Sequence, residues 1–195
     1  MKNLNIPTRI AGCEPVVIEI PKGSRHKYEY RYTDADSASN GGSEFVLDRV
    51  VDLPYPCHYG FIPYTLADDG DALDVIMLGD DPAIGTGSIL QTEVIGMLDM
   101  YDTVDGEVKR DAKMLVVPQG SDIRPTPEMK KAIEDFFSSY KAGVTVVGFF
   151  GKKSALPIIG SAYAAYKYNQ ASLTAARDMF KDLPNLDYLL GQETV

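Results

Sequence analysis

The feature of this sequence that most constrains its fold is a series of short β-type segments between residues 15 and 118. β-branched and aromatic residues dominate these segments, and Gly, Asp, Asn and Pro separate them. No regular helical pattern alternates with the segments, which disfavours a doubly wound βαβ sheet and favours a small barrel or sandwich. The predicted strands are 15–21, 26–32, 44–51, 73–78, 89–98 and 113–118.

The pattern changes after this β-rich part. Thr126 is a predicted N-cap, Pro127 suits the first helical position, and apolar residues then recur at helical spacing up to Tyr140. Residues 144–150 form another predicted strand, and a last helix is expected across roughly 161–181. The sequence therefore predicts an α+β fold that is mainly β.

The chain shows no internal repeat and no convincing linker, so we expect a single domain over residues 1–195. Its start lacks the apolar segment of a secretory signal. The longest mostly apolar run, 156–166, is shorter than the roughly 20 residues that a membrane span needs. We therefore expect a cytoplasmic protein that does not bind membranes.

The composition limits the kinds of partner and of metal. The chain carries 28 acidic and 19 basic residues, a net charge of -9, which argues against a nucleic-acid-binding protein with its usual basic face. Its two cysteines, Cys13 and Cys57, have no CxxC or Cys/His spacing, and only two histidines are present. A metal site would therefore use oxygen ligands, which favour Mg²⁺, Mn²⁺ or Ca²⁺ over zinc.

Residues 68–75, DDGDALDV, place four aspartates directly before an apolar strand. A turn at Asp69-Gly70-Asp71 would bring its carboxylates close to Asp74 at one end of a sheet. Two such charges about 4 Å apart repel by roughly 4 kcal/mol at an effective dielectric near 20. The carboxylates therefore either point into water as a solvated turn or hold a divalent cation, and the octapeptide alone is compatible with both. The spacing does not fit an EF-hand.

Other polar clusters have equally ordinary explanations when each is taken alone. Lys27 and Glu29 share one face of a strand, which is typical of a weak surface pair. The segment 102–113 has the composition of a polar hairpin, and 55–60 is an aromatic turn that packing would explain. Together, however, many carboxylates, isolated cations and phenols fit a polyanionic substrate held between metal ions and cationic side chains.

These segments, taken in order, resemble the motifs of the soluble family I inorganic pyrophosphatases of the bacterial type. The resemblance is collinear over about residues 15–150. It rests on DGDALDV at 69–75, VVIEIP with Glu19, KYE with Lys27 and Glu29, DR with Arg49, YPCHYG with Tyr55 and Tyr59, DAK with Asp111 and Lys113, and YK at Tyr140-Lys141. It implies a five-stranded OB-like β-barrel with flanking α-helices and Mg²⁺-dependent hydrolysis of inorganic pyrophosphate to two orthophosphates.

The resemblance also implies a set of metal ligands. Asp69, Asp74 and Asp111 would hold the first metal, Asp74 would bridge to a second, and Asp71 would contact the water between them. Two cations on one water lower its pKa and supply hydroxide as the nucleophile, whose proton Asp71 would accept or orient. Further Mg²⁺ ions would be positioned by Asp102, Asp111 and Glu29. Mn²⁺ and Co²⁺ are the expected substitutes.

Substrate contacts follow from the same resemblance. The expected ligands of the phosphate oxygens are Lys27, Arg49, Lys113, Tyr140 and Lys141. Tyr59 would hydrogen-bond the phosphoryl region, and Tyr55 and Glu19 would shape the cavity. The residues assigned to catalysis are Asp71, Tyr59, Arg49 and Lys27. A homo-oligomer is expected, with a hexamer favoured and a dimer as the alternative.

The sequence departs from the family pattern at a few positions. Ala72 stands where proline is common, His58 stands where asparagine is common, and Thr103 stands where an acid often follows the first aspartate. The segment 102–111 is longer than in the bacterial members. Asp105 and Glu107 are therefore alternatives to Asp102 as a metal ligand.

Pyrophosphate hydrolysis has two alternatives. A metal-dependent phosphohydrolase could act on nucleotides or another small phosphate ester, but the sequence offers no aromatic sandwich or Gly-rich loop suited to a base. A non-enzymatic OB-type module could bind oligonucleotides, but the net charge of -9 opposes it.

Overall fold

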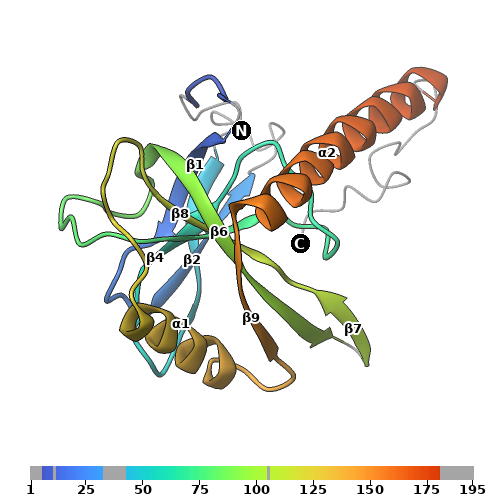
Figure 1. The fold of residues 1–195 in the computed structure, drawn as a ribbon. Coiled ribbons are helices and arrows are strands. Elements are labelled where there is room, and N and C mark those ends of the chain that lie inside the picture. The colour runs from blue at the N-terminus through green and yellow to red at the C-terminus, as the bar shows by residue number, and fades with distance from the viewer. Residues whose placement is uncertain (1–5, 11, 33–42, 105, 181–195) are drawn as a thin grey trace.

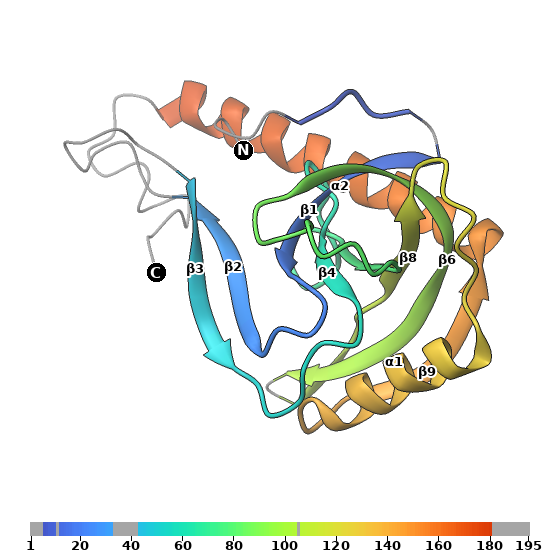
Figure 2. The same ribbon diagram turned by 90° about the vertical axis from the view of Figure 1, so that its left-hand side faces the viewer.

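A closed ring of five β-strands forms the centre of the molecule (Figure 2). The structure, a computed structural model, describes residues 6–10, 12–32, 43–104 and 106–180 of the 195-residue chain. The ring runs in the order β1 (Cys13–Ile20), β4 (His58–Phe61), β5 (Asp74–Met77), β8 (Lys113–Pro118) and β6 (Ile89–Val104), and β6 pairs back with β1. Only the β5–β8 pair of the ring is parallel. This ring confirms the predicted OB-like barrel.

Four further strands lie around the ring. β7 (Glu107–Arg110) forms a hairpin with the C-terminal end of β6. β9 (Thr145–Gly151) pairs with residues 96–101 in the middle of β6. β2 (His26–Tyr32) and β3 (Ser43–Val50) form a separate two-stranded sheet beside the barrel. β4 was not predicted, because the sequence of 55–60 suggested an aromatic turn, and its four buried residues are too few to show a period.

Helix α1 (Pro127–Ser139) begins where the sequence predicts, with Thr126 Oγ1 accepting a hydrogen bond from Met129 N at 3.3 Å. Helix α2 (Lys152–Phe180) begins nine residues before the predicted start at 161. The predicted helix did not include Pro157, and a proline inside a helix removes one intrahelical hydrogen bond. Burial of Ala155, Ile159 and Ala162 against the barrel offsets that loss.

Side chains of the ring strands alternate between two hydrophobic cores, as the period of two in a strand requires. Val75 and Met77 pack with the buried face of α2, whereas Ile76 and Leu78 pack with α1. The two helices therefore cover different parts of the barrel, and α2 extends well beyond it (Figure 1). In the described part of the chain, no helix is long and apolar enough to cross a membrane.

Candidate active site

Residues 65–74, which we call the acidic loop, connect β4 to β5 and carry the aspartates of the DDGDALDV motif. Gly70 has a φ of +100°, a conformation that favours glycine, and Asp71 N donates to Asp69 Oδ1 at 3.1 Å. Ala67 N donates to the Asp71 carbonyl at 2.8 Å, which closes the turn. The predicted chain reversal at Asp69-Gly70-Asp71 is confirmed.

Two carboxylates from neighbouring strands meet at the buried ammonium of Lys113. Asp74 begins β5, Asp111 lies just before β8, and the parallel pairing of these strands brings both to one end of the barrel. Lys113 Nζ lies 2.7 Å from Asp74 Oδ2 and 2.9 and 3.0 Å from the two oxygens of Asp111. Tyr59 Oη donates to the same Asp74 oxygen at 2.5 Å. We call Asp69, Asp71, Asp74 and Asp111 the acidic wall.

The acidic wall carries more negative charge than its lysine neutralises. Burial and the nearby Asp69 and Asp74 carboxylates raise the pKa of Asp71 above its ordinary value. Burial also raises the pKa of Asp111, although the ammonium of Lys113 acts in the opposite direction. Burial lowers the pKa of Lys113, but Asp74 and Asp111 outweigh it and raise the pKa above the ordinary value.

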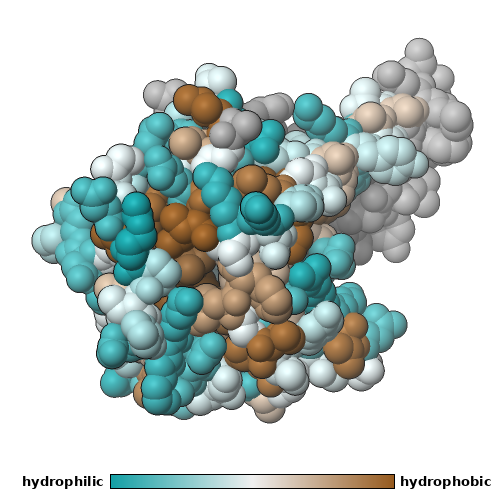
Figure 3. Space-filling view, in the orientation of Figure 1, coloured by the Kyte–Doolittle hydropathy of each residue, from teal (hydrophilic) through white to brown (hydrophobic). Residues whose placement is uncertain are grey.

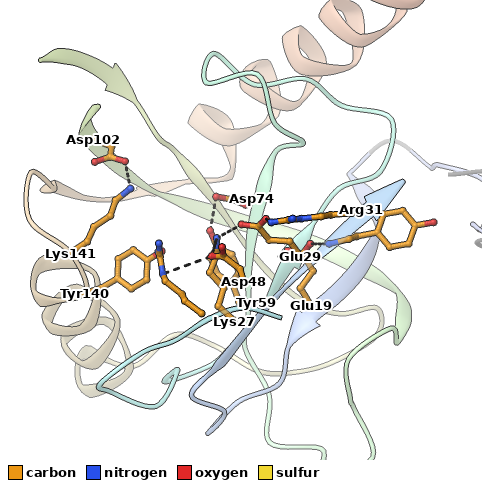
Figure 4. A network of polar contacts seen from close by, with 12 residues as sticks. Glu19, Lys27, Glu29, Arg31, Asp48, Tyr59, Asp74, Asp102, Tyr140 and Lys141 are labelled. Carbon is orange, nitrogen blue, oxygen red and sulfur yellow. Dashed lines mark hydrogen bonds and ion pairs between the residues drawn. The ribbon is translucent and has the colours of Figure 1, made fainter. Parts of the chain in front are cut away.

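The other side chains of the site come from outside the ring. Figure 4 shows Lys27, Tyr140 and Lys141 among them, and together with Arg49 of β3 we call these residues the cationic wall. Lys27 Nζ lies 2.6 Å from Glu29 Oε1, as expected for two residues on one face of a strand. Arg49 donates to the hydroxyl of Tyr140, and its guanidinium lies 5.1 Å from the centre of that ring. β2, β3 and the end of α1 are thereby brought together.

Asp48 is part of this arrangement, although the sequence did not indicate it. Lys27 Nζ lies 3.3 Å from Asp48 Oδ2. In a regular strand the side chain of Asp48 would point to the other face from those of Arg49 and Leu47. The pairing with β2 shifts between Lys27 and Tyr28, however, so Asp48 is an extra residue in β3, a β-bulge. A bulge of this kind leaves no signal in a hydrophobicity pattern, so only the structure reveals the contact.

Asp102 lies on β6 with only 7% of its surface exposed, and its carboxylate pairs with the ammonium of Lys141. Its Oδ1 atom is buried without a hydrogen-bond partner in the described part of the chain. The lengthened segment forms the β6–β7 hairpin, in which Asp102 faces Lys109 and exposed Glu107 lies two pairs nearer the tip. Asp105 lies outside the described residues. The geometry favours Asp102 over Glu107 as a ligand.

Glu19 and Tyr55 lie beside the site rather than between its walls. Glu19 Oε1 accepts a hydrogen bond from Tyr30 N at 2.9 Å, which connects β1 of the ring to β2. Burial raises the pKa of Glu19 to about 8, the Tyr30 N–H opposes that shift, and the Asp74 charge adds to it. Tyr55 is buried, and its ring centre lies 4.6 Å from that of Phe136 in α1.

The side chains of the site fit a hard divalent cation. In the arrangement seen among the described residues, no three His, Cys, Asp or Glu side chains form a group that could hold one ion, because Lys113 lies between Asp74 and Asp111. The available donors are nevertheless all carboxylate oxygens, and burial, together with neighbouring aspartates, raises the pKa of Asp71 and Asp111. The unpartnered Oδ1 of Asp102 is a further free acceptor.

Comparisons with known proteins agree with this geometry. The family model described as "Inorganic pyrophosphatase" matches residues 16–167. The inorganic pyrophosphatase of Thermus thermophilus is 37% identical over 186 residues, which cover 86% of this chain and 98% of that protein. The protein of the same name from Synechocystis is 40% identical over 174 residues, which cover 80% of this chain and 94% of that protein.

Solved structures show the same fold. The crystal structure of the Thermus thermophilus inorganic pyrophosphatase superposes with a TM-score of 0.71 at 34% identity, covering 85% of this chain and 98% of that chain. The Neisseria gonorrhoeae inorganic pyrophosphatase superposes with a TM-score of 0.70 at 30% identity, with coverage of 85% and 98%.

Proposed function

The chain belongs to the inorganic pyrophosphatase family and hydrolyses inorganic pyrophosphate with the help of metal ions, and we propose that its ion is Mg²⁺. The observation that carries this proposal is the pairing of the two walls. The partly buried carboxylates of Asp74 and Asp111 surround the buried ammonium of Lys113, and the cations of the second wall come from different elements. A highly charged phosphate anhydride requires such a site, because its charge must be neutralised from more than one side.

The residues proposed to hold the metal are those of the acidic wall. Asp69, Asp74 and Asp111 would bind the first ion, with Asp74 shared by a second. When bound, such ions lower the pKa of a water ligand towards neutrality and neutralise charge on the phosphates. Glu29 and Asp102 are proposed as ligands of further ions, since each lies at the edge of the site and pairs with a lysine.

Asp71 is proposed to accept or orient the proton of the attacking water. Its backbone is fixed by the turn, since its N–H bonds to Asp69 and its carbonyl accepts from Ala67. Burial and the negative neighbours of Asp71 raise its pKa, and adjacent cations would lower it again and keep the carboxylate ionised. Asp71 can then serve as a base at neutral pH.

The cationic wall and Lys113 are proposed to bind the phosphate oxygens. The Arg49 fork suits two oxygens of one phosphate, and Tyr140 already holds that guanidinium in place. Lys27 and Lys141 pair with carboxylates, so phosphate would take over part of those interactions. The Tyr59 hydroxyl bonds to Asp74, so its proposed contact with the phosphoryl region would be made from a position fixed by that carboxylate.

We further propose a cytoplasmic homo-oligomer, a hexamer rather than a dimer, with Mn²⁺ and Co²⁺ as substitute ions. The chain length, which resembles that of bacterial members, supports the hexamer. Both cysteines are free, as a reducing compartment would keep them. The net charge of -9 argues against nucleic acid as a ligand.

The test is the release of phosphate from pyrophosphate with Mg²⁺, repeated with EDTA and with ATP and p-nitrophenyl phosphate as substrates. We expect rapid release from pyrophosphate that EDTA abolishes, and much slower release from ATP, a nucleotide anhydride, and from p-nitrophenyl phosphate, an ester. Absence of Mg²⁺-dependent turnover of pyrophosphate would refute the proposal. Comparable turnover of ATP or p-nitrophenyl phosphate would favour a general phosphohydrolase instead.

A further inference from the structure

Tyr64, the residue before the acidic loop, has an unusual backbone conformation. Its φ is +62°, and it is the only residue other than glycine with a positive φ among the residues that the structure describes. Such a conformation costs on the order of 1–3 kcal/mol and persists only where surrounding contacts enforce it. Contacts on both sides of Tyr64 must therefore hold the entry to the acidic loop.

Helix α2 provides these contacts. The ring of Tyr64 packs edge-to-face against Tyr166, with the ring centres 5.9 Å apart and the planes at 66°. Two residues further along the loop, Leu66 N donates to the carbonyl of Ala162 at 3.0 Å. Ala162 and Tyr166 are four residues apart, so they lie on the same face of α2. One turn of α2 thus supports the beginning of the acidic loop.

An open cavity of about 400 Å³ separates the rest of the acidic loop from α2. Its lining includes Asp69 and Ala67 from the loop, Asp111 near β8, and Ser161 and Ala165 from α2. Protein interiors are normally close-packed, so a gap of this size means that few atoms support the loop on this side. The position of the acidic loop on this side therefore depends mainly on the contacts that α2 makes with Tyr64 and Leu66.

The acidic loop is internally stiff, so a shift at its start would reach the aspartates. Thr65 Oγ1 donates to the Ile62 carbonyl at 2.6 Å and accepts from Leu73 N at 2.8 Å, which fastens the two ends of the loop together. The Ala67–Asp71 bond closes the tip. A movement of this unit would change the distance from Asp69 and Asp71 to Asp111, which belongs to a different strand.

We propose that Tyr166 is a positioning residue that sets the spacing between the acidic loop and Asp111, and with it the affinity of the acidic wall for its metal ion. The proposal rests on the proposed function, because it takes the acidic wall as the metal site. Tyr166 lies outside that site and acts through Tyr64. Its removal should loosen the loop and weaken metal binding, while the cationic wall and the chemistry at saturating metal stay as they are.

The experiment compares Tyr166→Ala with Tyr166→Phe, which keeps the ring, and with Tyr168→Ala on the same helix, where the side chain is 78% exposed. The readouts are amide hydrogen exchange of residues 65–74 without metal, Mn²⁺ binding by electron paramagnetic resonance without substrate, and kcat at saturating Mg²⁺. For Tyr166→Ala we expect faster exchange and about three- to tenfold weaker Mn²⁺ binding, which is about 0.7–1.4 kcal/mol and within the size of long-range couplings. Its kcat should stay within about twofold, because saturating Mg²⁺ compensates for weaker binding and no group that contacts the substrate is changed.

Tyr166→Phe and Tyr168→Ala should match the wild type in all three readouts. Tyr64→Gly relaxes the backbone but removes the ring, so it should weaken Mn²⁺ binding as Tyr166→Ala does, and the two changes should not add in the double variant. Wild-type exchange and Mn²⁺ binding in Tyr166→Ala would overturn the proposal, as would additive effects in the double variant. Failure of the wild type to hydrolyse pyrophosphate would refute the proposed function instead, since exchange and Mn²⁺ binding do not depend on turnover.

Discussion

The two walls of the site differ in how the fold supports them. Asp74 and Asp111 of the acidic wall lie at the start of β5 and just before β8 in the closed ring, and Asp69 and Asp71 lie on the loop whose two ends Thr65 fastens together. The cationic wall lies on the separate β2–β3 sheet and just beyond the end of α1. Ring strands are hydrogen-bonded on both sides, whereas β2 and β3 pair only with each other among the described strands. The acidic wall is therefore the more constrained of the two.

This difference suits the two proposed tasks. Metal ligands must keep fixed distances, because coordination geometry tolerates little displacement. Side chains that bind phosphate oxygens can instead adjust when substrate arrives, since a flexible lysine or a hinged sheet can follow the anion. The comparison predicts that substitutions in the acidic wall alter metal binding and kcat. Substitutions in the cationic wall should instead lower kcat/KM for pyrophosphate.

Asp71→Asn should have the largest effect. The amide cannot accept a proton as the carboxylate does, and the loss of a general base lowers rates by about 10²–10⁴-fold. We expect kcat near neutral pH to fall by that order while the KM for pyrophosphate changes only a few-fold. The fold should persist, since the turn depends on the backbone of Asp71 rather than on its side chain. Near-normal turnover would remove Asp71 from the proposed role.

Arg49→Ala tests the other wall and should have the next largest effect. A hydrogen bond to a charged group contributes about 1.5–3 kcal/mol, so kcat/KM for pyrophosphate should fall about 10- to 100-fold. Arg124→Ala is the matched control, because that arginine is exposed and bonds only to the neighbouring Ile123 carbonyl among the contacts described. An equal loss in both variants would show a general effect of charge rather than a contact with substrate.

A comparison of Asp102→Asn with Glu107→Gln tests which of these two acids is a metal ligand beside the cationic wall. Asp102 is buried and pairs with Lys141, whereas Glu107 is exposed near the hairpin tip. In the presence of pyrophosphate, Asp102→Asn should raise the Mg²⁺ concentration for half-maximal rate by about tenfold, equivalent to about 1.4 kcal/mol. Glu107→Gln should leave it unchanged. The reverse pattern would assign the ligand to Glu107.

The smallest effect is expected for Glu19→Gln, at the junction between the ring and the β2–β3 sheet. This substitution should change how the free energy of unfolding depends on pH. Because the folded protein raises the pKa of Glu19 from 4.5 to about 8, its protonated form stabilises the fold at low pH. That stabilisation is complete below about pH 4.5 and disappears as pH rises through about 8. In metal-free protein, the free energy of unfolding should therefore decline less for Glu19→Gln than for the wild type as pH rises between these values. Parallel pH profiles, measured by urea unfolding, would contradict this account.

The parts of the structure that could be predicted are those in which residue type and spacing determine the contact. The acidic turn and the Lys27–Glu29 pair each follow from neighbours in sequence, and the structure confirms both. The family resemblance added the arrangement of distant segments, which the ring of five strands confirms.

The parts that could not be predicted depend on packing between distant elements. The bulge at Asp48 interrupts an alternation that the sequence pattern continues through, and the hydrogen bond from Tyr30 to Glu19 joins two separate sheets. The early start of α2 depends on burial that compensates for Pro157. The backbone of Tyr64 is enforced by a helix about a hundred residues later in the chain.

The most direct test of the division between the walls is Mn²⁺ binding without pyrophosphate, measured by electron paramagnetic resonance on Asp74→Asn and Arg49→Ala. The account predicts that Asp74→Asn loses the tight Mn²⁺ site, because Asp74 is the proposed shared ligand at the start of β5. It predicts that Arg49→Ala binds Mn²⁺ as the wild type does, while its kcat/KM is reduced. Unchanged Mn²⁺ binding in Asp74→Asn, or equal loss in both variants, would contradict the assignment of metal to one wall and phosphate to the other.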